Sequence, residues 1–248
     1  MLKKLLGSAG FIQAVELWPP GYSPVRPGES LQRQFESLCG RMGELEGHFD
    51  AFLMADPKVP EMGFLDPVVT SIRLKEKFPR AEVAPTIASR DRNRRALQQA
   101  LATSMWAGID NLVLVRGDPF HEKGQRVPAN VYDVKRVADL VRMAREAQRL
   151  TGTRDLCLLT PVDVSKSGDV EYLSILKGRE RASSDAFLSQ PFMGPPEDYL
   201  LGVDSIRAAG VRSPIMANVF PLYSYDDAVG ISKRFGMPVP RTVLDQLR

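Results

Sequence analysis

The chain has 248 residues, of which 44% are hydrophobic and 25% are charged. These fractions are ordinary for a globular protein, so the chain can bury a large core. Its net charge of +3 is too small to indicate a nucleic-acid-binding protein. No apolar run is long enough to cross a bilayer, which argues against a membrane protein.

Strand-like apolar runs alternate along the chain with longer segments of helical periodicity. The predicted strands are residues 11–18, 49–56, 82–89, 111–118, 156–163, 185–192 and 213–220. The predicted helices are residues 31–45, 66–78, 91–108, 130–150, 169–182, 196–209 and 224–236. Seven β-then-α units in a row imply a parallel sheet.

Two α/β folds contain such a sheet. An open, doubly wound sheet usually has a glycine-rich turn after its first strand, and the segment ELWPPGY (residues 16–22) contains no GxGxxG. We therefore favour a (β/α)8 TIM barrel, formed by residues 1–248 as one domain. Residues 237–248 offer at most a stub strand and a short helix, so the last β/α unit is expected to be truncated or atypical.

The cysteines and the N-terminus bear on the cellular compartment. Cys39 and Cys157 are far apart and form no CxxC pair, which argues against a zinc or iron–sulfur site and against a disulfide framework. The N-terminal segment is weakly similar to a signal peptide, but Gly7 and Gly10 interrupt its apolar run. We therefore expect a cytoplasmic protein.

A polar side chain stands near the carboxyl end of each predicted strand. These residues are Glu16, Asp56, Thr86, Ser89, Arg116, Asp118, Thr160, Asp163, Gln190 and Asn218. In (β/α)8 barrels the active site lies at this end of the strands, so the pattern predicts a ligand site there. Loops begin at the same positions, which by itself also makes strand ends polar.

Glu16 is the most informative of these residues. It lies between Val15 and Leu17 and is followed by Trp18. A carboxyl group in apolar surroundings tends to have a raised pKa, because desolvation disfavours the anion. A raised pKa suits a general acid at neutral pH. The alternative is a structural glutamate in a salt bridge.

Two further segments carry candidate binding residues. The sequence Arg116-Gly117-Asp118-Pro119 ends the most apolar strand, and Gly117 would let the backbone approach a ligand closely. A tight turn with a surface Arg–Asp pair would also fit, and the polar loop that follows could be a lid or a plain surface loop. Gln190, between aromatic residues, could pair with the edge of a heterocycle or be a satisfied core amide.

Five segments together resemble one family. They are VELWPP (residues 15–20), TIASRDRNR (86–94), AGIDNLVLVRGDP (107–119), FLSQPF (187–192) and SPIMANVFPL (213–222). They occur in the order, and at the barrel positions, of the corresponding motifs of methylenetetrahydrofolate reductases. The run that ends in Arg-Gly-Asp-Pro is the most specific of the five.

The resemblance implies an oxidoreductase that reduces 5,10-methylenetetrahydrofolate to 5-methyltetrahydrofolate, with FAD relaying a hydride from NADH or NADPH. It implies that Glu16 is the general acid and that Asp118 lies near both flavin and pterin. Substrate contacts are then expected from Gln190, Asn218 and Phe220. The expected cofactor contacts are Thr86, Ser89, Arg116, Gly117, Asp118 and Thr160.

The sequence also departs from the family, mainly where the flavin is expected. Thr86 stands where the family has a histidine, and MADPKVPEM (54–62) replaces a glycine-rich segment. LTPVDVSKS (159–167) lacks the tyrosine and histidine of the matching segment, and the last β/α unit is not recognisable. Glu16, Asp118 and Gln190 are retained.

Three hypotheses remain. The first is the FAD-dependent reductase. The second is a reductase without flavin, or one that acts on another pterin. The third is a partner-dependent, pterin-binding subunit of a larger complex, because a barrel open at its last strand has exposed edges that need cover. In each case we expect a folate or related pterin ligand, a homo-oligomer or a complex with another subunit, and no metal, nucleic acid or membrane.

Overall fold

The fold is described from a computed structural model. It describes residues 2–7, 12–22, 30–57, 63–117, 120–122, 125–127, 130–192, 194–219, 222, 224–235 and 239–248. Its main sheet has seven strands in the order β1-β3-β5-β6-β9-β10-β11, and its neighbouring strands are parallel. These strands are β1 (Ala14–Leu17), β3 (Ala51–Met54), β5 (Val83–Ala88), β6 (Asn111–Val115), β9 (Cys157–Val162), β10 (Ala186–Ser189) and β11 (Ile215–Met216).

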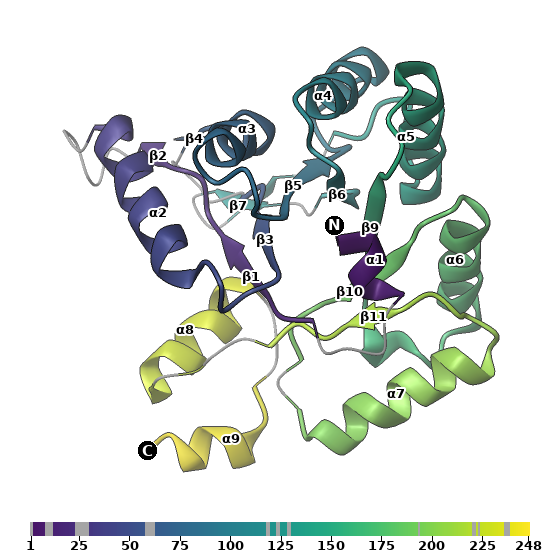
Figure 1. Ribbon diagram of the computed structural model, residues 1–248. Coiled ribbons are helices and arrows are strands. Elements are labelled where there is room, and N and C mark those ends of the chain that lie inside the picture. Colours follow the sequence, from purple (N-terminus) through teal and green to yellow (C-terminus); the bar gives the residue numbers. More distant parts are fainter. Residues whose placement is uncertain are drawn as a thin grey trace. The chain divides into compact units, whose positions relative to one another are not determined.

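A helix follows each of these strands, as in a (β/α)8 fold (Figure 1). The helices are α2 (Leu31–Leu45), α3 (Pro67–Lys77), α4 (Arg94–Trp106), α5 (Val137–Thr151), α6 (Val170–Arg181), α7 (Pro196–Ala208) and α8 (Tyr225–Phe235). The predicted α/β fold class is therefore confirmed, and every predicted strand contains one of these strands. None of the described helices is long and apolar enough to cross a membrane.

Side-chain caps fix where several helices begin. Ser30 accepts a hydrogen bond from the backbone N–H of Arg33, Asp66 accepts from Val68 and Val69, and Asn93 accepts from Ala96. Helix α5 begins at Val137 rather than at the predicted residue 130. The segment before it is tied to the end of β5 instead, because the Asn130 carbonyl accepts from the N–H of Asp91, which has a positive φ of 58°.

The chain divides into two compact units, and the first consists of Met1–Thr160 with Ala182–Asp185. In this unit α2, α3, α4 and α5 cover one face of strands β1, β3, β5 and β6 (Figure 1). Leu17 and Phe52 pack against α2, and Ile87 and Leu112 pack against α4 and α5. Successive residues of a strand point to opposite sides. The residues next in sequence to these four core residues therefore point away from the helices, to what we call the inner face. They are Glu16, Leu53, Thr86 and Val113.

The second unit consists of Pro161–Arg181 and Ala186–Arg248. Its core joins Val162 at the end of β9, Leu176 of α6, Phe187 of β10 and Ile206 of α7. A short helix, α9 (Arg241–Gln246), follows α8, and no strand follows β11 among the residues that the structure describes. The predicted short terminal helix is thus confirmed. The predicted stub strand falls partly on residues 237 and 238, which lie outside the described residues.

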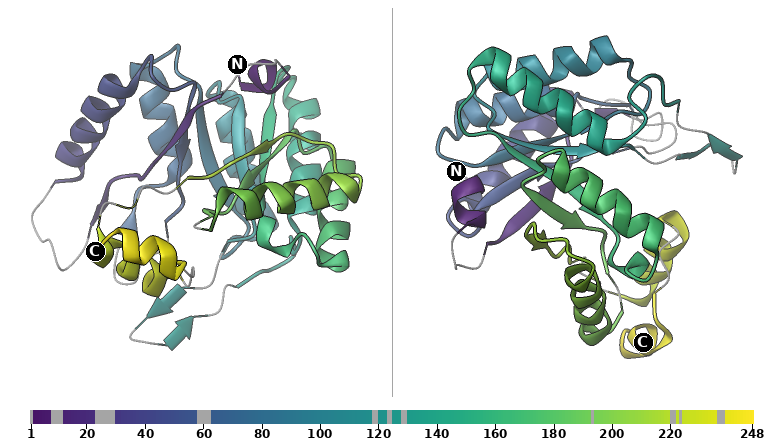
Figure 2. Two further views of the ribbon diagram at one scale, coloured as in Figure 1. Left: turned by 90° about the horizontal axis from the view of Figure 1, so that it is seen from below. Right: turned by 90° about the vertical axis from the view of Figure 1, so that its right-hand side faces the viewer.

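Several short elements have no counterpart in the predictions. In the first unit, helix α1 (Leu2–Leu6) lies at the end where the strands begin, and the hairpin β7 (Phe120–Glu122) and β8 (Gln125–Val127) lies at the opposite end (Figure 2, left). A second antiparallel pair, β2 (Gly21–Tyr22) and β4 (Gly63–Phe64), joins the loops after β1 and β3. The single-domain prediction for residues 1–248 stays a prediction.

Candidate functional site

The candidate acid, Glu16, lies on the inner face of the first unit. It is paired in register with Leu53 of β3, which is itself paired with Ala84 of β5. Trp18 follows two residues later and therefore lies on the same side of the chain. The backbone N–H of Ala55 bonds to the Leu17 carbonyl, so the ladder between these two segments continues past the end of β1. Glu16 and Trp18 are thus consecutive inner-face residues.

The surroundings of Glu16 affect its proton affinity in two opposite ways. Burial among the neighbouring strands raises the pKa of the Glu16 carboxyl above its usual value, and a hydrogen bond from Trp18 partly offsets this rise. The side chain still has substantial contact with solvent, so the desolvation is partial. No cation among the described residues pairs with Glu16. A carboxyl with a raised pKa that solvent can reach suits a general acid.

The ends of β5 and β6 bring three predicted cofactor residues together. The N–H of Ser89 bonds to the Val115 carbonyl at 3.0 Å, and the Ser89 hydroxyl donates to the Arg116 carbonyl at 3.3 Å. Gly117 lies against Arg90, since a Cβ atom on Gly117 would be 2.8 Å from the Cβ of Arg90. Ser89 is buried and uses its hydroxyl within the protein, so it positions this turn. The Arg116 side chain is exposed.

Thr86 lies in the middle of β5 and is half buried. It is on the inner face and is paired with Val113 of β6. Its inner-face neighbours on the same strand, Ala84 and Ala88, are small and buried. Asp118, predicted both as a catalytic residue and as a cofactor contact, lies outside the described residues.

Thr160 is not brought together with these residues. It lies two residues after Leu158 and so faces the same side of β9. Leu158 packs into the core under α4 and α5. Its hydroxyl is fully buried and lies 3.0 Å from the hydroxyl of Ser184. The geometry therefore gives Thr160 a place in the helix-facing core instead of on the inner face.

In the second unit, the backbones of two predicted substrate-binding residues hydrogen-bond to one serine side chain. The hydroxyl of Ser189, the last residue of β10, accepts the backbone N–H of Asn218 at 2.8 Å and donates to the Gln190 carbonyl at 3.0 Å. The Gln190 side chain is exposed, so it is not a satisfied core amide. Phe220, the third predicted substrate residue, lies outside the described residues.

Two residues of the candidate site were not proposed from the sequence, although a local pattern pointed to each of them. Trp18 is two positions from Glu16, and strand alternation alone would have placed both side chains on one face. Ser189 directly precedes Gln190, but its link to Asn218 depends on the pairing of β10 with β11. Phe64, which contacts the Trp18 ring edge to face, comes from a separate loop and left no local signal.

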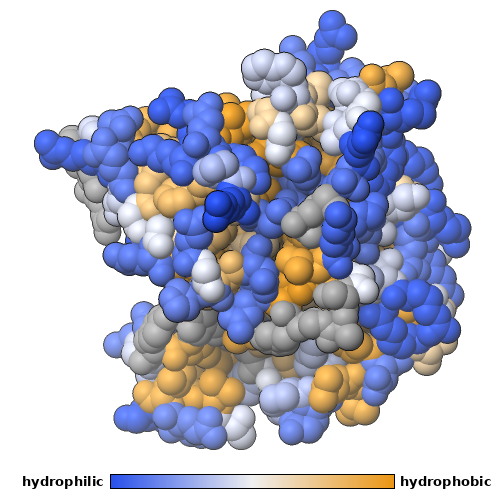
Figure 3. All heavy atoms as spheres, in the orientation of Figure 1, coloured by the Kyte–Doolittle hydropathy of each residue, from blue (hydrophilic) through white to orange (hydrophobic). Residues whose placement is uncertain are grey.

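The arginines at the start of α5 and along it differ in exposure. Arg136, Arg142 and Arg149 are exposed, and Figure 3 shows mostly hydrophilic residues over this helix. Arg145 is different, because it is half buried and donates hydrogen bonds to the carbonyls of Ser183 and Leu156. The group is therefore a solvated helix face with one structural arginine.

Comparison with solved structures agrees with the fold. Two crystal forms of 2,3-dimethylmalate lyase, a PEP mutase/isocitrate lyase superfamily member, superpose with TM-scores of 0.56 and 0.55. They are 12% and 14% identical in sequence, and the matches cover 99% of this chain and 91% and 88% of theirs. At such low identity the likeness concerns the fold alone.

Comparison of sequences identifies the family. Methylenetetrahydrofolate reductase 1 of Schizosaccharomyces pombe is 24% identical over 155 residues, which are 61% of this chain and 24% of that protein. This chain thus matches only about a quarter of that relative's length. The sequence profile of methylenetetrahydrofolate reductases matches residues 70–248, which is well over half of the chain. The chain belongs to the methylenetetrahydrofolate reductase family.

Proposed function

We propose that this protein reduces 5,10-methylenetetrahydrofolate to 5-methyltetrahydrofolate, with NADH or NADPH as the source of the hydride. Family membership supports the reaction class. The observation that carries the proposal is Glu16, an inner-face carboxyl whose pKa is raised by burial and which no described cation neutralises. This residue lies outside the part of the chain that the family profile matches, residues 70–248.

Glu16 serves as the general acid in this proposal. The methylene carbon of the substrate bridges two nitrogens in a five-membered ring. A proton from the Glu16 carboxyl goes to the departing nitrogen, the bond between that nitrogen and the methylene carbon breaks, and an iminium ion is left. A hydride added to the iminium carbon completes the methyl group. The raised pKa keeps a larger share of Glu16 protonated near neutral pH.

Gln190 and Asn218 are the proposed pterin-binding residues. A glutamine side chain offers both an acceptor and two donors, which suits the mixed donor and acceptor edge of a pterin. Ser189 supports this role, because it bonds to the backbone of both residues and so limits their movement.

FAD is the proposed hydride carrier, and Thr86 of β5 is the residue proposed to contact it. Ala84 and Ala88, its inner-face neighbours on this strand, are small and buried. The half-buried Thr86 hydroxyl could accept or donate a hydrogen bond to a flavin. Bound FAD would supply the hydride for the methylene carbon.

Thr86 also motivates a second candidate function. The family that the sequence resembles has a histidine at this position, whereas threonine has neither an imidazole ring nor a positive charge. A variant of the reaction without flavin, in which nicotinamide gives its hydride directly to the iminium ion, would not need that histidine. A pterin-binding role within a larger complex remains a prediction.

Two experiments test these proposals. Glu16→Gln keeps the shape of the side chain but cannot donate a proton in the same way, so we expect kcat to fall about 100-fold or more. Unchanged turnover would remove Glu16 from the chemistry. The visible absorption spectrum, recorded before and after adding FAD, separates the two candidates: a bound-flavin spectrum supports the FAD relay, whereas a protein that fails to bind FAD supports direct transfer.

A further inference from the structure

We propose that Tyr172 of α6 is a positioning residue for Gln190, and that it fixes the direction in which the Gln190 amide meets the pterin. The Tyr172 hydroxyl accepts a hydrogen bond of 2.6 Å from the backbone N–H of Asp163, the residue directly after β9. The proposal rests on the proposed function, in which Gln190 binds the substrate, although the link between the two residues can be tested without any activity.

A single peptide unit joins Tyr172 to Gln190. The carbonyl of Val162 accepts the backbone N–H of Gln190 at 2.7 Å. This carbonyl and the N–H of Asp163 belong to the same peptide unit, which is planar because its C–N bond has partial double-bond character. In a trans peptide the two groups point in opposite directions, so Tyr172 holds one edge of the plane and Gln190 is held by the other. A rotation of this plane would therefore disturb both hydrogen bonds.

The two hydrogen bonds of this peptide unit also strengthen each other. An N–H group that donates a hydrogen bond polarises its peptide unit, and the carbonyl of that unit becomes a better acceptor. The bond from Asp163 to Tyr172 is partly buried, so the N–H would lose an acceptor that water replaces poorly. Without the Tyr172 hydroxyl, the Val162 carbonyl would hold Gln190 less firmly.

A second side chain of α6 holds the preceding peptide unit. Arg179 follows Tyr172 by seven residues, about two helical turns, so both lie on the same face of α6. The buried Arg179 guanidinium donates a hydrogen bond to the Pro161 carbonyl. Proline has no backbone N–H, so this carbonyl is its only backbone group that can form a hydrogen bond. Helix α6 thus fixes the end of β9 at two consecutive peptide units.

The Tyr172 ring is itself held by two kinds of contact. It packs against the core of the second unit, which includes Leu176 of the same helix. The ammonium group of Lys166, in the short 3-10 helix η1 (Val164–Lys166), lies 5.8 Å from the ring centroid and is attracted to the ring electrons. Lys166 also pairs with the Asp163 carboxylate at 3.3 Å. These contacts keep the Tyr172 hydroxyl near the backbone that it binds.

The backbone of Gln190 is fixed while its side chain remains exposed. Its N–H bonds to the Val162 carbonyl, and its own carbonyl accepts from the Ser189 hydroxyl at 3.0 Å. A glutamine amide has a donor end and an acceptor end, so its fit to a pterin edge depends on its orientation. Tyr172 therefore supports the N–H side of Gln190, and Ser189 supports the carbonyl side.

Tyr199 of α7 offers a matched control. It packs against the same core as Tyr172, and its ring contacts that of Phe192 with the centroids 5.5 Å apart. Its hydroxyl is buried and has no hydrogen-bond partner within the part of the chain that the structure describes. Tyr172→Phe and Tyr199→Phe thus remove the same atom from the same core. Only the first removes a hydrogen bond to the end of β9.

Hydrogen exchange, followed by NMR, tests the link without substrate. In Tyr172→Phe we expect the Gln190 amide to exchange about five- to tenfold faster, because its acceptor is held less firmly. The amide of Phe187, which bonds to the Pro214 carbonyl at 2.8 Å in the same unit, should be affected less. Tyr199→Phe should change neither rate. No acceleration at Gln190, or an equal acceleration at Phe187, would overturn the proposal.

A double-mutant cycle then tests the positioning role. We expect Tyr172→Phe to raise the KM for methylenetetrahydrofolate about three- to tenfold with little change in kcat, since one supporting hydrogen bond is lost. Tyr199→Phe should keep the KM of the unmodified protein. In a Gln190→Ala background, Tyr172→Phe should have little further effect, because the residue through which it acts is gone. A merely structural role would raise the KM equally in both backgrounds, and that result would contradict the proposal.

The two kinds of failure are distinguishable. If the unmodified protein does not reduce methylenetetrahydrofolate, the proposed function fails, while hydrogen exchange still decides whether Tyr172 holds the backbone of Gln190. If the protein is active and Gln190→Ala raises the KM, but Tyr172→Phe behaves like Tyr199→Phe, only the Tyr172 proposal fails.

Discussion

Ser189 and Asn218 are joined by a hydrogen bond of 2.8 Å between the serine hydroxyl and the asparagine backbone N–H. The same hydroxyl donates to the carbonyl of Gln190 at 3.0 Å. One buried side chain thus links the residues that follow β10 to those that follow β11. The two residues proposed to bind the pterin depend on a third residue that need not touch it.

Replacement of Ser189 by alanine should weaken both stability and substrate binding. The N–H of Asn218 loses its acceptor, so we expect a loss of about 1–3 kcal/mol in the free energy of unfolding. The KM for the folate substrate should rise more than kcat falls. Ser205→Ala is a matched control, because the Ser205 hydroxyl only bonds to the Leu201 carbonyl within α7. Equal behaviour of the two variants in thermal unfolding and kinetics would contradict this account.

Gly117→Ala should destabilise the protein more than Gly152→Ala does. Both glycines have positive φ, 88° and 71°, so alanine is strained at each position. Only at Gly117 would the added Cβ also collide with Arg90, whereas nothing lies within 4 Å at Gly152. We expect an additional loss of about 1–3 kcal/mol at Gly117 from this crowding. Melting temperatures of the two variants, measured by circular dichroism, give the comparison.

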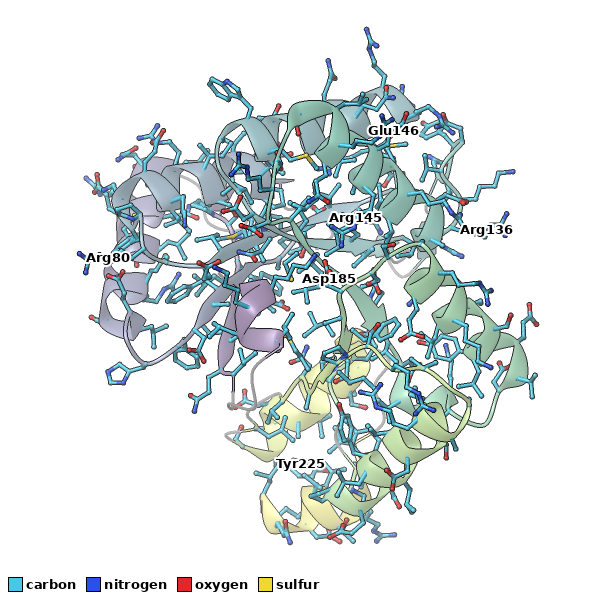
Figure 4. The ribbon with its side chains drawn as sticks, turned by 45° about the vertical axis from the view of Figure 1, so that its right-hand side comes forward. Arg80, Arg136, Arg145, Glu146, Asp185 and Tyr225 are labelled. Carbon is cyan, nitrogen blue, oxygen red and sulfur yellow. The ribbon has the colours of Figure 1, made fainter. Side chains whose placement is uncertain are left out.

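Arg145→Lys should also lower the stability, for a reason visible in Figure 4. Arg145 of α5 points toward Asp185, and its guanidinium group also reaches two backbone carbonyls. Lysine cannot serve three partners in this fixed geometry. We expect a loss of about 1.5–3 kcal/mol in urea unfolding.

The control for Arg145 is Arg136→Lys at the N-cap of the same helix. The Arg136 side chain is 83% exposed, and its ion pair with Asp139 is long at 3.5 Å. Such a surface pair contributes little, so this variant should unfold like the unmodified protein. A control that loses as much stability as Arg145→Lys would argue against a special role for Arg145.

Glu16→Gln should stabilise the folded protein at neutral pH. The folded-state pKa of Glu16 is raised, so the folded protein binds this proton more tightly than the unfolded chain does. The favourable contribution is fully present below the unfolded pKa of about 4.3 and is lost as the pH rises through the folded pKa. The neutral glutamine avoids this loss. We expect a higher melting temperature than that of the unmodified protein at pH 7 and no advantage near pH 4; a variant that is less stable at both pH values would contradict the raised pKa.

The order and type of the main elements could be predicted because they depend on local signals. Helix α2 was predicted with the observed bounds, since apolar periodicity and the Ser30 cap agree there. Strand bounds were less accurate: residues 213–220 were predicted as a strand, but in the part of this segment that the structure describes the strand is Ile215–Met216. The ladder of β2 and β4 was missed, because each strand has two residues and pairs with a distant loop.

The candidate site was predictable to the extent that strand ends and alternation define it. Glu16 and Thr86 lie on one face as expected from parallel strands. Thr160 was predicted as a cofactor contact because of its place near a strand end. It faces the helices, however, because alternate residues of β9 face the same side and Leu158 packs against α4 and α5. Ser189 acts through hydrogen bonds to Asn218 and Gln190, and the bond to Asn218 becomes evident only once β10 and β11 are paired.

The most direct test of the account is to incubate the purified protein with 5,10-methylenetetrahydrofolate and NADH or NADPH, with and without FAD, and to measure 5-methyltetrahydrofolate by mass spectrometry. We predict product formation by the unmodified protein and a loss of about 100-fold or more in Glu16→Gln. The absence of product under every combination of cofactors, in a protein shown to be folded, would contradict the proposed reaction.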